Sequence, residues 1–276
     1  MTANHEHQSY ASPLTSIIIL TRNGLPFTKE CILSIFRHTK ENFELILVDN
    51  GSTDGTLEFL KTLPYTKVIA NKENKGFSGG CNQGITIARG ENIVLLNNDT
   101  VVTNEWLCRL LWQLNKDPSI GIVGPRSNNV VSHQAITPTP YKNMDQMQKF
   151  ANEWTQKHDQ QGYEVDYLSG LCMIFKRSLI NMIGGLDERF SPGYFEDADF
   201  SIRAQISNRE LWVANDVFIH HYGSSSFRLN RALQNKIILD SQKKFFLKWK
   251  MSNLKEIKET VEREKPFNRE RHYIPF

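Results

Sequence analysis

The alternation of apolar runs with helix-like stretches over the first 125 residues constrains the fold most. Five runs rich in Ile, Val and Leu have the length of buried strands, and apolar residues at helical spacing fill the segments between them. Strands separated by helices form βαβ units, and strands without polar positions lie in a sheet covered on both faces. The sequence therefore predicts an α/β fold with a mainly parallel sheet flanked by helices. The five predicted strands are residues 16–20, 44–48, 67–70, 93–96 and 120–123.

Polar residues stand at the ends of two of these strands, where open parallel sheets bind their ligands. Asp49 ends the second strand and precedes the turn Asn50-Gly-Ser-Thr53. Its carboxylate can accept hydrogen bonds from a base or a ribose, or it can simply cap the turn. Asn97-Asn-Asp99 ends the fourth strand. Asp99 suits a hard divalent cation that shares oxygen ligands with substrate phosphates, provided that a second protein ligand comes from elsewhere.

A glycine-rich turn at residues 76–80 opens the helix that follows the third strand. Glycines beside a helix N-terminus let backbone N–H groups approach an anion. The segment lacks the spacing of a dinucleotide-binding fingerprint and the ending of a Walker loop. Tight packing of the helix explains these glycines as well as ligand contact does.

Three acids begin a predicted helix at Glu196, Asp197 and Asp199. The helix dipole alone favours carboxylates there. A carboxylate kept ionised at a helix N-terminus can also serve as a general base that takes a proton from a hydroxyl.

Two histidines, His220 and His221, follow the last predicted strand and precede a Gly/Ser loop. His220, at the strand end, can complete a cation site with Asp99. The alternative is a structural histidine, which is the commoner role of a single histidine.

The second half of the chain has less regular patterns. We predict that residues 127–145 form a loop over the site, because many of them are polar and two are prolines. The other expected elements are helices at 150–159, 178–183, 195–206 and 229–249, and strands at 166–175, 211–214 and 217–219.

The C-terminal stretch, residues 228–276, is basic, with Lys and Arg outnumbering Asp and Glu roughly two to one. Residues 243–250 interleave lysines with Phe245, Phe246 and Trp249. A helix of this kind can lie on anionic lipid, or it can pack its aromatic residues on the domain.

Composition excludes several classes of protein. The four cysteines are scattered, which argues against a disulfide framework or a zinc ribbon and favours a reducing compartment. A net charge of +3 gives no support to nucleic-acid binding. No apolar run is long enough for a bilayer, and residues 1–13 are polar, which predicts a flexible N-terminus rather than a signal peptide. We therefore expect a cytoplasmic protein that can also lie peripherally on the inner face of a membrane.

Taken together, these segments resemble the family-2 glycosyltransferases, which have the GT-A fold, and within them the rhamnosyltransferase-like branch that builds bacterial surface polysaccharides. The resemblance spans about residues 16–227. It rests on residues 15–23, 48–56, 74–77, 82–84, 96–99 and 184–190, on Glu196-Asp197, and on His220.

The resemblance implies a role for each matched residue. Asp197 would be the catalytic base, with Glu196 and Asp199 beside it. Asp99 and His220 would hold Mg²⁺ or Mn²⁺ on the donor diphosphate. Asn97-Asn98 stands where the family's first acid is expected, so we predict weaker metal binding. The residues expected to bind the nucleotide sugar are Thr21, Asn23, Asp49, Asn74, Gly76, Asn82, Asn98 and Asp99.

The resemblance also implies a domain division and a reaction. Residues 14–125 would form the nucleotide-sugar half, 126–227 the smaller acceptor half, and 228–276 a helical extension. The reaction would be inverting transfer from a UDP- or dTDP-sugar to a hydroxyl of a glycan or a lipid-linked acceptor. The alternatives are a glycoside hydrolase, a sugar-nucleotide pyrophosphorylase, and a non-catalytic carbohydrate-binding or scaffold module.

Overall fold

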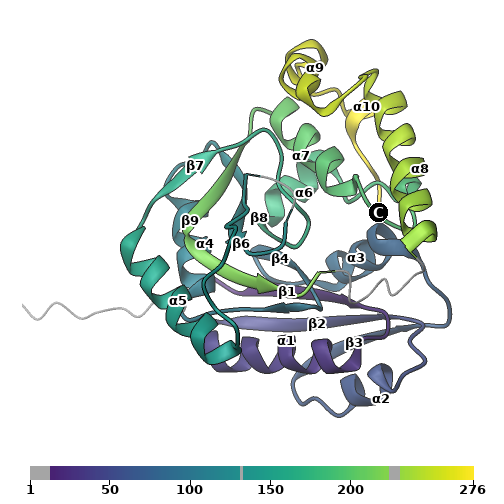
Figure 1. The fold of residues 1–276 in the computed structure, drawn as a ribbon. Helices are drawn as coiled ribbons and strands as arrows, with labels where there is room; N and C mark the ends of the chain where they lie inside the picture. Colours follow the sequence, from purple (N-terminus) through teal and green to yellow (C-terminus); the bar gives the residue numbers. More distant parts are fainter. Residues whose placement is uncertain (1–12, 131–132, 224–230) are drawn as a thin grey trace, which may run out of the picture.

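A computed structural model describes residues 13–130, 133–223 and 231–276 of the chain. Within these ranges, a nine-stranded sheet has the order β3-β2-β1-β4-β8-β6-β9-β5, and β7 pairs with β9. Helices cover both faces of this sheet (Figure 1). Two predicted segments, the flexible N-terminus up to residue 12 and the Gly/Ser loop at 224–227, lie outside the described ranges.

The first four strands form the parallel half of the sheet. Each pairs in parallel with its neighbours in the order β3-β2-β1-β4. The predicted βαβ pattern is therefore confirmed here. The elements are β1 (Thr15–Thr21), α1 (Leu25–His38), β2 (Phe43–Asn50), α2 (Thr56–Lys61), β3 (Thr66–Asn71), α3 (Gly76–Ile87), β4 (Asn92–Asn97) and α4 (Trp106–Asn115).

The inner strands β1, β2 and β4 are mainly apolar because both of their faces are buried. Ile17 and Ile19 of β1 pack with α1 and α4, whereas Ile18 packs on the other face with Cys81 and Ile85 of α3. This two-sided burial is the reason that the strands show no alternation with polar residues.

Beyond β4 the sheet is mixed. β8 lies antiparallel between β4 and β6, and β9 runs parallel to β6. β5 and β7 are short strands antiparallel to β9. The elements are β5 (Thr100–Val101), β6 (Ile120–Ser127), α5 (Met144–Lys157), β7 (Gly162–Glu164), β8 (Cys172–Lys176), α6 (Arg177–Ile183), the 3₁₀ turn η1 (Glu188–Phe190), α7 (Glu196–Ile206) and β9 (Glu210–His221).

The structure differs from the sequence prediction in three places. The strands expected at 211–214 and 217–219 are one strand, β9, with a register shift opposite Pro125. The strand expected at 166–175 begins only at Cys172, because side chains bind the preceding N–H groups: Ser201 accepts from Leu168 N–H and Asp197 from Gly170 N–H. Helix α5 begins earlier than expected, since the side chain of its N-cap Asn143 accepts from Gln146 N–H.

The C-terminal stretch packs against α7. It contains α8 (Arg231–Trp249), η2 (Leu254–Glu256), α9 (Ile257–Glu264) and α10 (Arg269–His272). Phe245 and Trp249 of α8 are buried in one cluster with Ile202 and Ile206 of α7, as the packing interpretation of this helix expects. The chain then returns to the core, where Ile274 bridges to Gly184, so that its end lies beside α3 (Figure 1). No helix in the described ranges has the length and apolar character needed to cross a membrane.

Candidate active site

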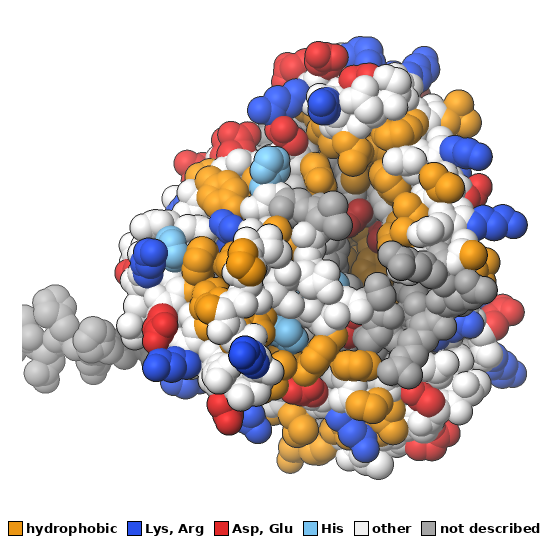
Figure 2. All heavy atoms as spheres, in the orientation of Figure 1, with side chains coloured by type: hydrophobic (Ala, Val, Ile, Leu, Met, Phe, Trp, Pro, Cys, Tyr) orange, Lys and Arg blue, Asp and Glu red, His pale blue; other side chains and the backbone are white. Residues whose placement is uncertain are grey.

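A cavity of about 460 Å³ opens at the carboxyl ends of β1 and β4. Figure 2 shows it as a hollow with acidic side chains inside and hydrophobic side chains at its edge. Its walls come from segments far apart in the sequence: the ends of β1 and β4, the loop before β8, the start of α7 and the end of β9. The predicted site residues that line it are Thr21, Asn74, Gly76, Asn98, Asp99, Glu196 and Asp197.

Asp99 and His221 form a pair on one wall of this cavity. Oδ1 of Asp99 lies 3.2 Å from Nε2 of His221, and Nδ1 of His221 lies 2.7 Å from the carbonyl oxygen of Asn129. Burial lowers the pKa of His221, but the hydrogen bond and charge of Asp99 outweigh it and raise this pKa overall. The bond to Asn129 fixes the imidazole with its Nε2 toward Asp99.

His220 points away from Asp99, contrary to the expectation from the sequence. Successive side chains of a strand point to opposite faces, so His220 and His221 of β9 cannot both face the cavity. Nδ1 of His220 lies 2.7 Å from the hydroxyl of Tyr141, and its ring lies edge-on to Tyr222. Burial lowers the pKa of His220 to about 4, which keeps it neutral. The histidine that meets Asp99 is therefore His221, and the pairing of Asp99 with His220 is corrected.

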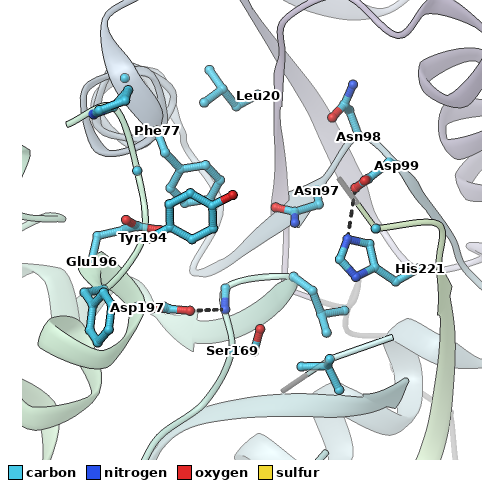
Figure 3. A pocket seen from close by; sticks show the side chains of 18 of the residues that line it. Leu20, Phe77, Asn97, Asn98, Asp99, Ser169, Tyr194, Glu196, Asp197 and His221 are labelled. Carbon is cyan, nitrogen blue, oxygen red and sulfur yellow. Dashed lines mark hydrogen bonds and ion pairs between the residues drawn. The ribbon is translucent and has the colours of Figure 1, made fainter. Parts of the chain in front are cut away.

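The two asparagines before Asp99 have different surroundings. Asn98 is buried and donates a hydrogen bond of 2.8 Å to the hydroxyl of Thr28 in α1. Asn97 projects into the cavity between Asp99 and Asp197 (Figure 3). An amide thus occupies the cavity wall where the resemblance expects an acid.

Glu196 and Asp197 form the opposite wall, at the start of α7. Asp197 accepts hydrogen bonds of 2.8 Å from the N–H groups of Gly170 and Ala198. Burial raises the pKa of Asp197, and these two hydrogen bonds oppose the rise. Burial and the charge of Asp197 raise the pKa of Glu196 well above its usual range, and Oε2 of Glu196 has no hydrogen-bond partner among the described residues. The expectation that helix-start acids stay ionised therefore neglects burial, which acts against the helix dipole.

Asp199, the third acid, points away from the cavity. It is fully buried, with Nε of Arg203 at 2.8 Å and Nζ of Lys248 at 2.5 Å. Burial raises its pKa, but these two cations hold the pKa of Asp199 below its usual range. Its role in this structure is to anchor α7.

At the end of β2, the Asp49 carboxylate closes the turn that follows the strand. It accepts from the N–H groups of Gly51 and Ser52 and from the Thr21 hydroxyl at 3.0 to 3.2 Å. It does not line the cavity, and the same holds for Asn23, which accepts from Thr53 N–H at 2.7 Å. The turn-cap interpretation therefore describes the Asp49 contacts.

The glycine-rich segment likewise contains residues that line the cavity and residues that do not. Asn74 and Gly76 line the cavity, whereas Asn82 binds Leu186 and Glu188. A Cβ on Gly76 would collide with the Ser191 hydroxyl, and Gly76 has φ of +76°. Gly76 is thus required where α3 meets the turn before α7.

Comparisons with known proteins agree with this geometry. A sequence profile of glycosyl transferase family 2 matches residues 16–184, more than half of the chain. The chain belongs to glycosyl transferase family 2. Its similarity to a Mycobacterium tuberculosis (strain ATCC 25618 / H37Rv) N-acetylglucosaminyl-diphospho-decaprenol L-rhamnosyltransferase, 24% identical over 77% of each chain, confirms the resemblance to the rhamnosyltransferase-like branch.

The solved structures confirm the fold class of this family-2 chain. A Pyrobaculum calidifontis mannosyltransferase in complex with GDP-Man and Mn²⁺ superposes with a TM-score of 0.58 at 17% identity, covering 91% of this chain and 74% of that one. The chain therefore has the GT-A fold. It spans only 25% of the uncharacterized protein y4gI of Sinorhizobium fredii, to which it is 26% identical over 78% of its own length.

Sequence reasoning missed several residues that line the cavity of this family-2 protein. The alternation of side chains along a strand would have identified His221, if the neighbouring position of Asp99 and β9 had been known. Arg22 follows β1 directly and is the only Lys or Arg among the residues lining the cavity in the described ranges. No sequence signal marks Tyr167, Tyr194 or Gln234, because they come from irregular segments and from the helix that the resemblance left outside the domain.

Proposed function

We propose that this protein transfers a glycosyl unit from a nucleoside diphosphate sugar to a hydroxyl group, with inversion at the anomeric carbon. The observation that carries the proposal is one cavity with Asp197 on one wall and the Asp99–His221 pair on the other (Figure 3). A base and a diphosphate site on opposite sides of a sugar are what a single in-line displacement requires.

The donor diphosphate would lie at Asp99 and His221, with Mn²⁺ or Mg²⁺. These side chains fit a divalent cation because a carboxylate oxygen and an imidazole nitrogen already converge, and Asn129 orients the imidazole from behind. The described residues contain no group of three or more His, Cys, Asp or Glu side chains suited to a metal. The diphosphate and water would therefore complete the coordination, and a bound cation would neutralise charge on the leaving diphosphate.

Asp197 would act as the base. Gly170 and Ala198 hold its carboxylate in one orientation, at the cavity wall opposite Asp99. It would take the proton of the acceptor hydroxyl as that oxygen attacks the anomeric carbon from the face opposite the diphosphate. Glu196, kept neutral by burial, would donate a hydrogen bond from its carboxyl group to a sugar hydroxyl.

For the substrates, we propose a UDP- or dTDP-sugar as donor and a lipid-linked saccharide as acceptor in bacterial surface-polysaccharide synthesis. Thr21, Arg22 and Asn50 would surround the base and ribose, with Asp49 stiffening their turn. The acceptor class is supported by the name of the mycobacterial relative, a rhamnosyltransferase acting on N-acetylglucosaminyl-diphospho-decaprenol.

We also propose that α8 lies on the inner face of the membrane that carries such an acceptor. Its outer side combines lysines with exposed leucines; Leu239 is 54% and Leu247 82% exposed. Lys236 and Lys243 share this stripe at helical spacing. In flotation with anionic vesicles, Leu239→Ser/Leu247→Ser should reduce binding, whereas Leu33→Ser on α1, another exposed leucine, should not.

The central test is an incubation with UDP-, dTDP- and GDP-sugars, Mn²⁺ and a disaccharide or lipid-linked acceptor. Released nucleoside diphosphate together with an inverted glycosidic product supports the proposal. Nucleoside triphosphate formed on addition of pyrophosphate indicates a pyrophosphorylase, and cleavage of glycosides without any nucleotide indicates a hydrolase. Specific binding of a sugar without turnover of any donor indicates a scaffold module.

A further inference from the structure

Helix α8 runs along residues 193–195, which directly precede α7, and contacts each of them. Ser241 donates to the carbonyl oxygen of Gly193 at 2.8 Å, and Gln234 donates to the hydroxyl of Tyr194 at 2.8 Å. The ring of Phe195 lies 5.2 Å from that of Phe245. A single helix face thus follows residues 193–195, which lead directly into Glu196 and Asp197.

This segment has a backbone that needs such support. Tyr194 and Phe195 have φ of 73° and 71°, which is unusual for residues with a Cβ. Non-glycine residues persist in this conformation only where the surrounding structure holds them, and such residues concentrate at functional sites. The contacts from α8 are therefore placed where they orient the two acids that follow.

Helix α8 also binds the carboxylate of Asp199, which follows Asp197 by two residues in the first turn of α7. Lys248 Nζ lies 2.5 Å from Asp199 Oδ1, and the Trp249 indole N–H donates to that oxygen at 2.9 Å. Arg203 binds the other oxygen, and its remaining N–H groups donate to carbonyl oxygens of Ile183 and Gly185. Because Asp199 has no exposed surface, each of these donors replaces water that burial removed.

We infer that Lys248 is a positioning residue for the proposed base Asp197, acting through Asp199, and that α8 belongs to the catalytic apparatus. The inference rests on the proposed function. Lys248 does not touch the cavity, and its ammonium group also pairs with Asp187 at 2.8 Å. Its effect on Asp197 is therefore indirect, through the placement and charge of the first turn of α7.

The charge has a defined direction of effect. Burial and the charges of Asp197 and Asp199 raise the pKa of Glu196, and the charge of Asp197 raises the pKa of Tyr167, so these groups share one negative field. Lys248 and Arg203 offset the charge of Asp199 within that field. Removing the Lys248 charge strengthens the negative field at Glu196 and Asp197. The pKa of the base should then rise, and the acidic limb of the pH–rate profile should move to higher pH.

The experiment compares Lys248→Met with Lys248→Arg and with the control Lys61→Met, an exposed lysine at the end of α2. We expect Lys248→Met to lower kcat by about tenfold or more, with little change in donor KM, and to move the acidic limb upward. Lys248→Arg should recover most of kcat and the original profile, and Lys61→Met should match the parent.

Two outcomes overturn the inference. One is an unchanged pH profile in a folded Lys248→Met protein; the other is an Arg variant as impaired as the Met variant at equal thermal stability. If Lys248→Met does not fold, Trp249→Phe replaces it, because it keeps the ring and removes one donor to Asp199. Parental kcat and pH profile in Trp249→Phe would then overturn the inference. Absence of transfer by the parent protein would instead contradict the proposed function.

Discussion

At the scale of single residues, the site depends on which of two adjacent side chains faces the cavity. His220 and His221 are identical in the sequence, yet one pairs with Asp99 and the other with Tyr141. The opposite directions of consecutive strand side chains separate them. Because only His221 faces the cavity, His220 can serve as a control for substitutions of His221.

His221→Ala and His220→Ala should therefore have different effects. Loss of His221 removes a proposed metal ligand, so the Mn²⁺ concentration for half-maximal activity should rise about tenfold or more. Loss of His220 removes a buried hydrogen bond to Tyr141, so it should lower Tm and leave the Mn²⁺ requirement unchanged. Titration of activity with Mn²⁺ after chelation measures the first effect and calorimetry the second. The reverse pattern would return the metal to His220.

Asp197→Asn tests the proposed role of Asp197 as the base. Asparagine keeps an acceptor oxygen for Gly170 N–H but cannot take a proton, so kcat should fall by at least about 10² while nucleotide affinity stays near that of the parent. Asp145→Asn, an exposed acid in the first turn of α5, is the matched control. Single-turnover rates and calorimetric titration with the nucleoside diphosphate give the two quantities. A near-normal rate would remove Asp197 from its role.

The sequence predicted the acids of this site better than their surroundings. Asp99, Glu196 and Asp197 reach one cavity because each follows an element boundary that apolar periodicity marks. Asp49 binds N–H groups of its own turn instead, since local turn geometry competes for its carboxylate. Asn82 binds the carbonyl oxygen of Leu186, 104 residues further along the chain. Such competition depends on distances of a few ångströms, which spacing along a chain does not contain.

At the scale of elements, periodicity identified the parallel strands and their helices but not β8. This strand is as apolar as β4, and nothing in its composition states that it enters antiparallel between β4 and β6. The order of the strands also decides which loops meet at the cavity, so the wall formed by the loop before β8 and the start of α7 could not be predicted. Substitutions at two loci, the start of α3 and the start of β2, test how neighbouring elements are held together.

The first locus is the start of α3. Gly76→Ala should destabilise the protein by more than about 1 kcal/mol, because φ is positive there and the new Cβ meets Ser191. Gly79→Ala, one turn later, meets only ordinary contacts and should be neutral or slightly stabilising, as alanine favours helices. Urea unfolding of both variants decides, and equal effects would show that the turn before α7 does not constrain α3.

The second locus is Glu44 at the start of β2. Burial raises its pKa, but hydrogen bonds from Lys67, Ser16 and the N–H of Arg89 outweigh this and lower the pKa to about 2. Its contribution to stability is therefore complete above its unfolded pKa of about 4.5 and is lost as the pH falls toward 2.

Glu44→Gln should accordingly destabilise the protein at pH 7, and the difference from the parent should shrink below about pH 4. Urea midpoints at several pH values measure it, with Glu58→Gln on the exposed side of α2 as control. A difference that is constant with pH would mean that the ion pair with Lys67 contributes nothing.

At the scale of the whole molecule, the question is whether residues 228–276 form a separate extension. The resemblance to family 2 covers about residues 16–227, and the remainder is expected to be a basic helical extension that either lies on lipid or packs its aromatic residues on the domain. In the structure, α8 and α9 share a buried cluster with α7, and Ile274 bridges to Gly184. The motifs therefore place the end of the domain near residue 227, whereas the buried contacts of α8 and α9 extend it to the end of the described chain. The two boundaries differ because motifs mark the site, and packing marks the core.

A chain truncated after residue 230 distinguishes them. If residues 231–276 complete the core, the full chain should unfold in one transition, and the truncated chain should lose it or unfold at a much lower temperature, since Phe190, Ile202 and Ile206 become exposed. Truncation also leaves Asp199 with Arg203 alone, without Lys248 or Trp249. Scanning calorimetry with near-ultraviolet circular dichroism measures both chains. If the truncated chain keeps the parental Tm, residues 14–227 form an independent domain, and the contacts of α8 contribute no stability to it.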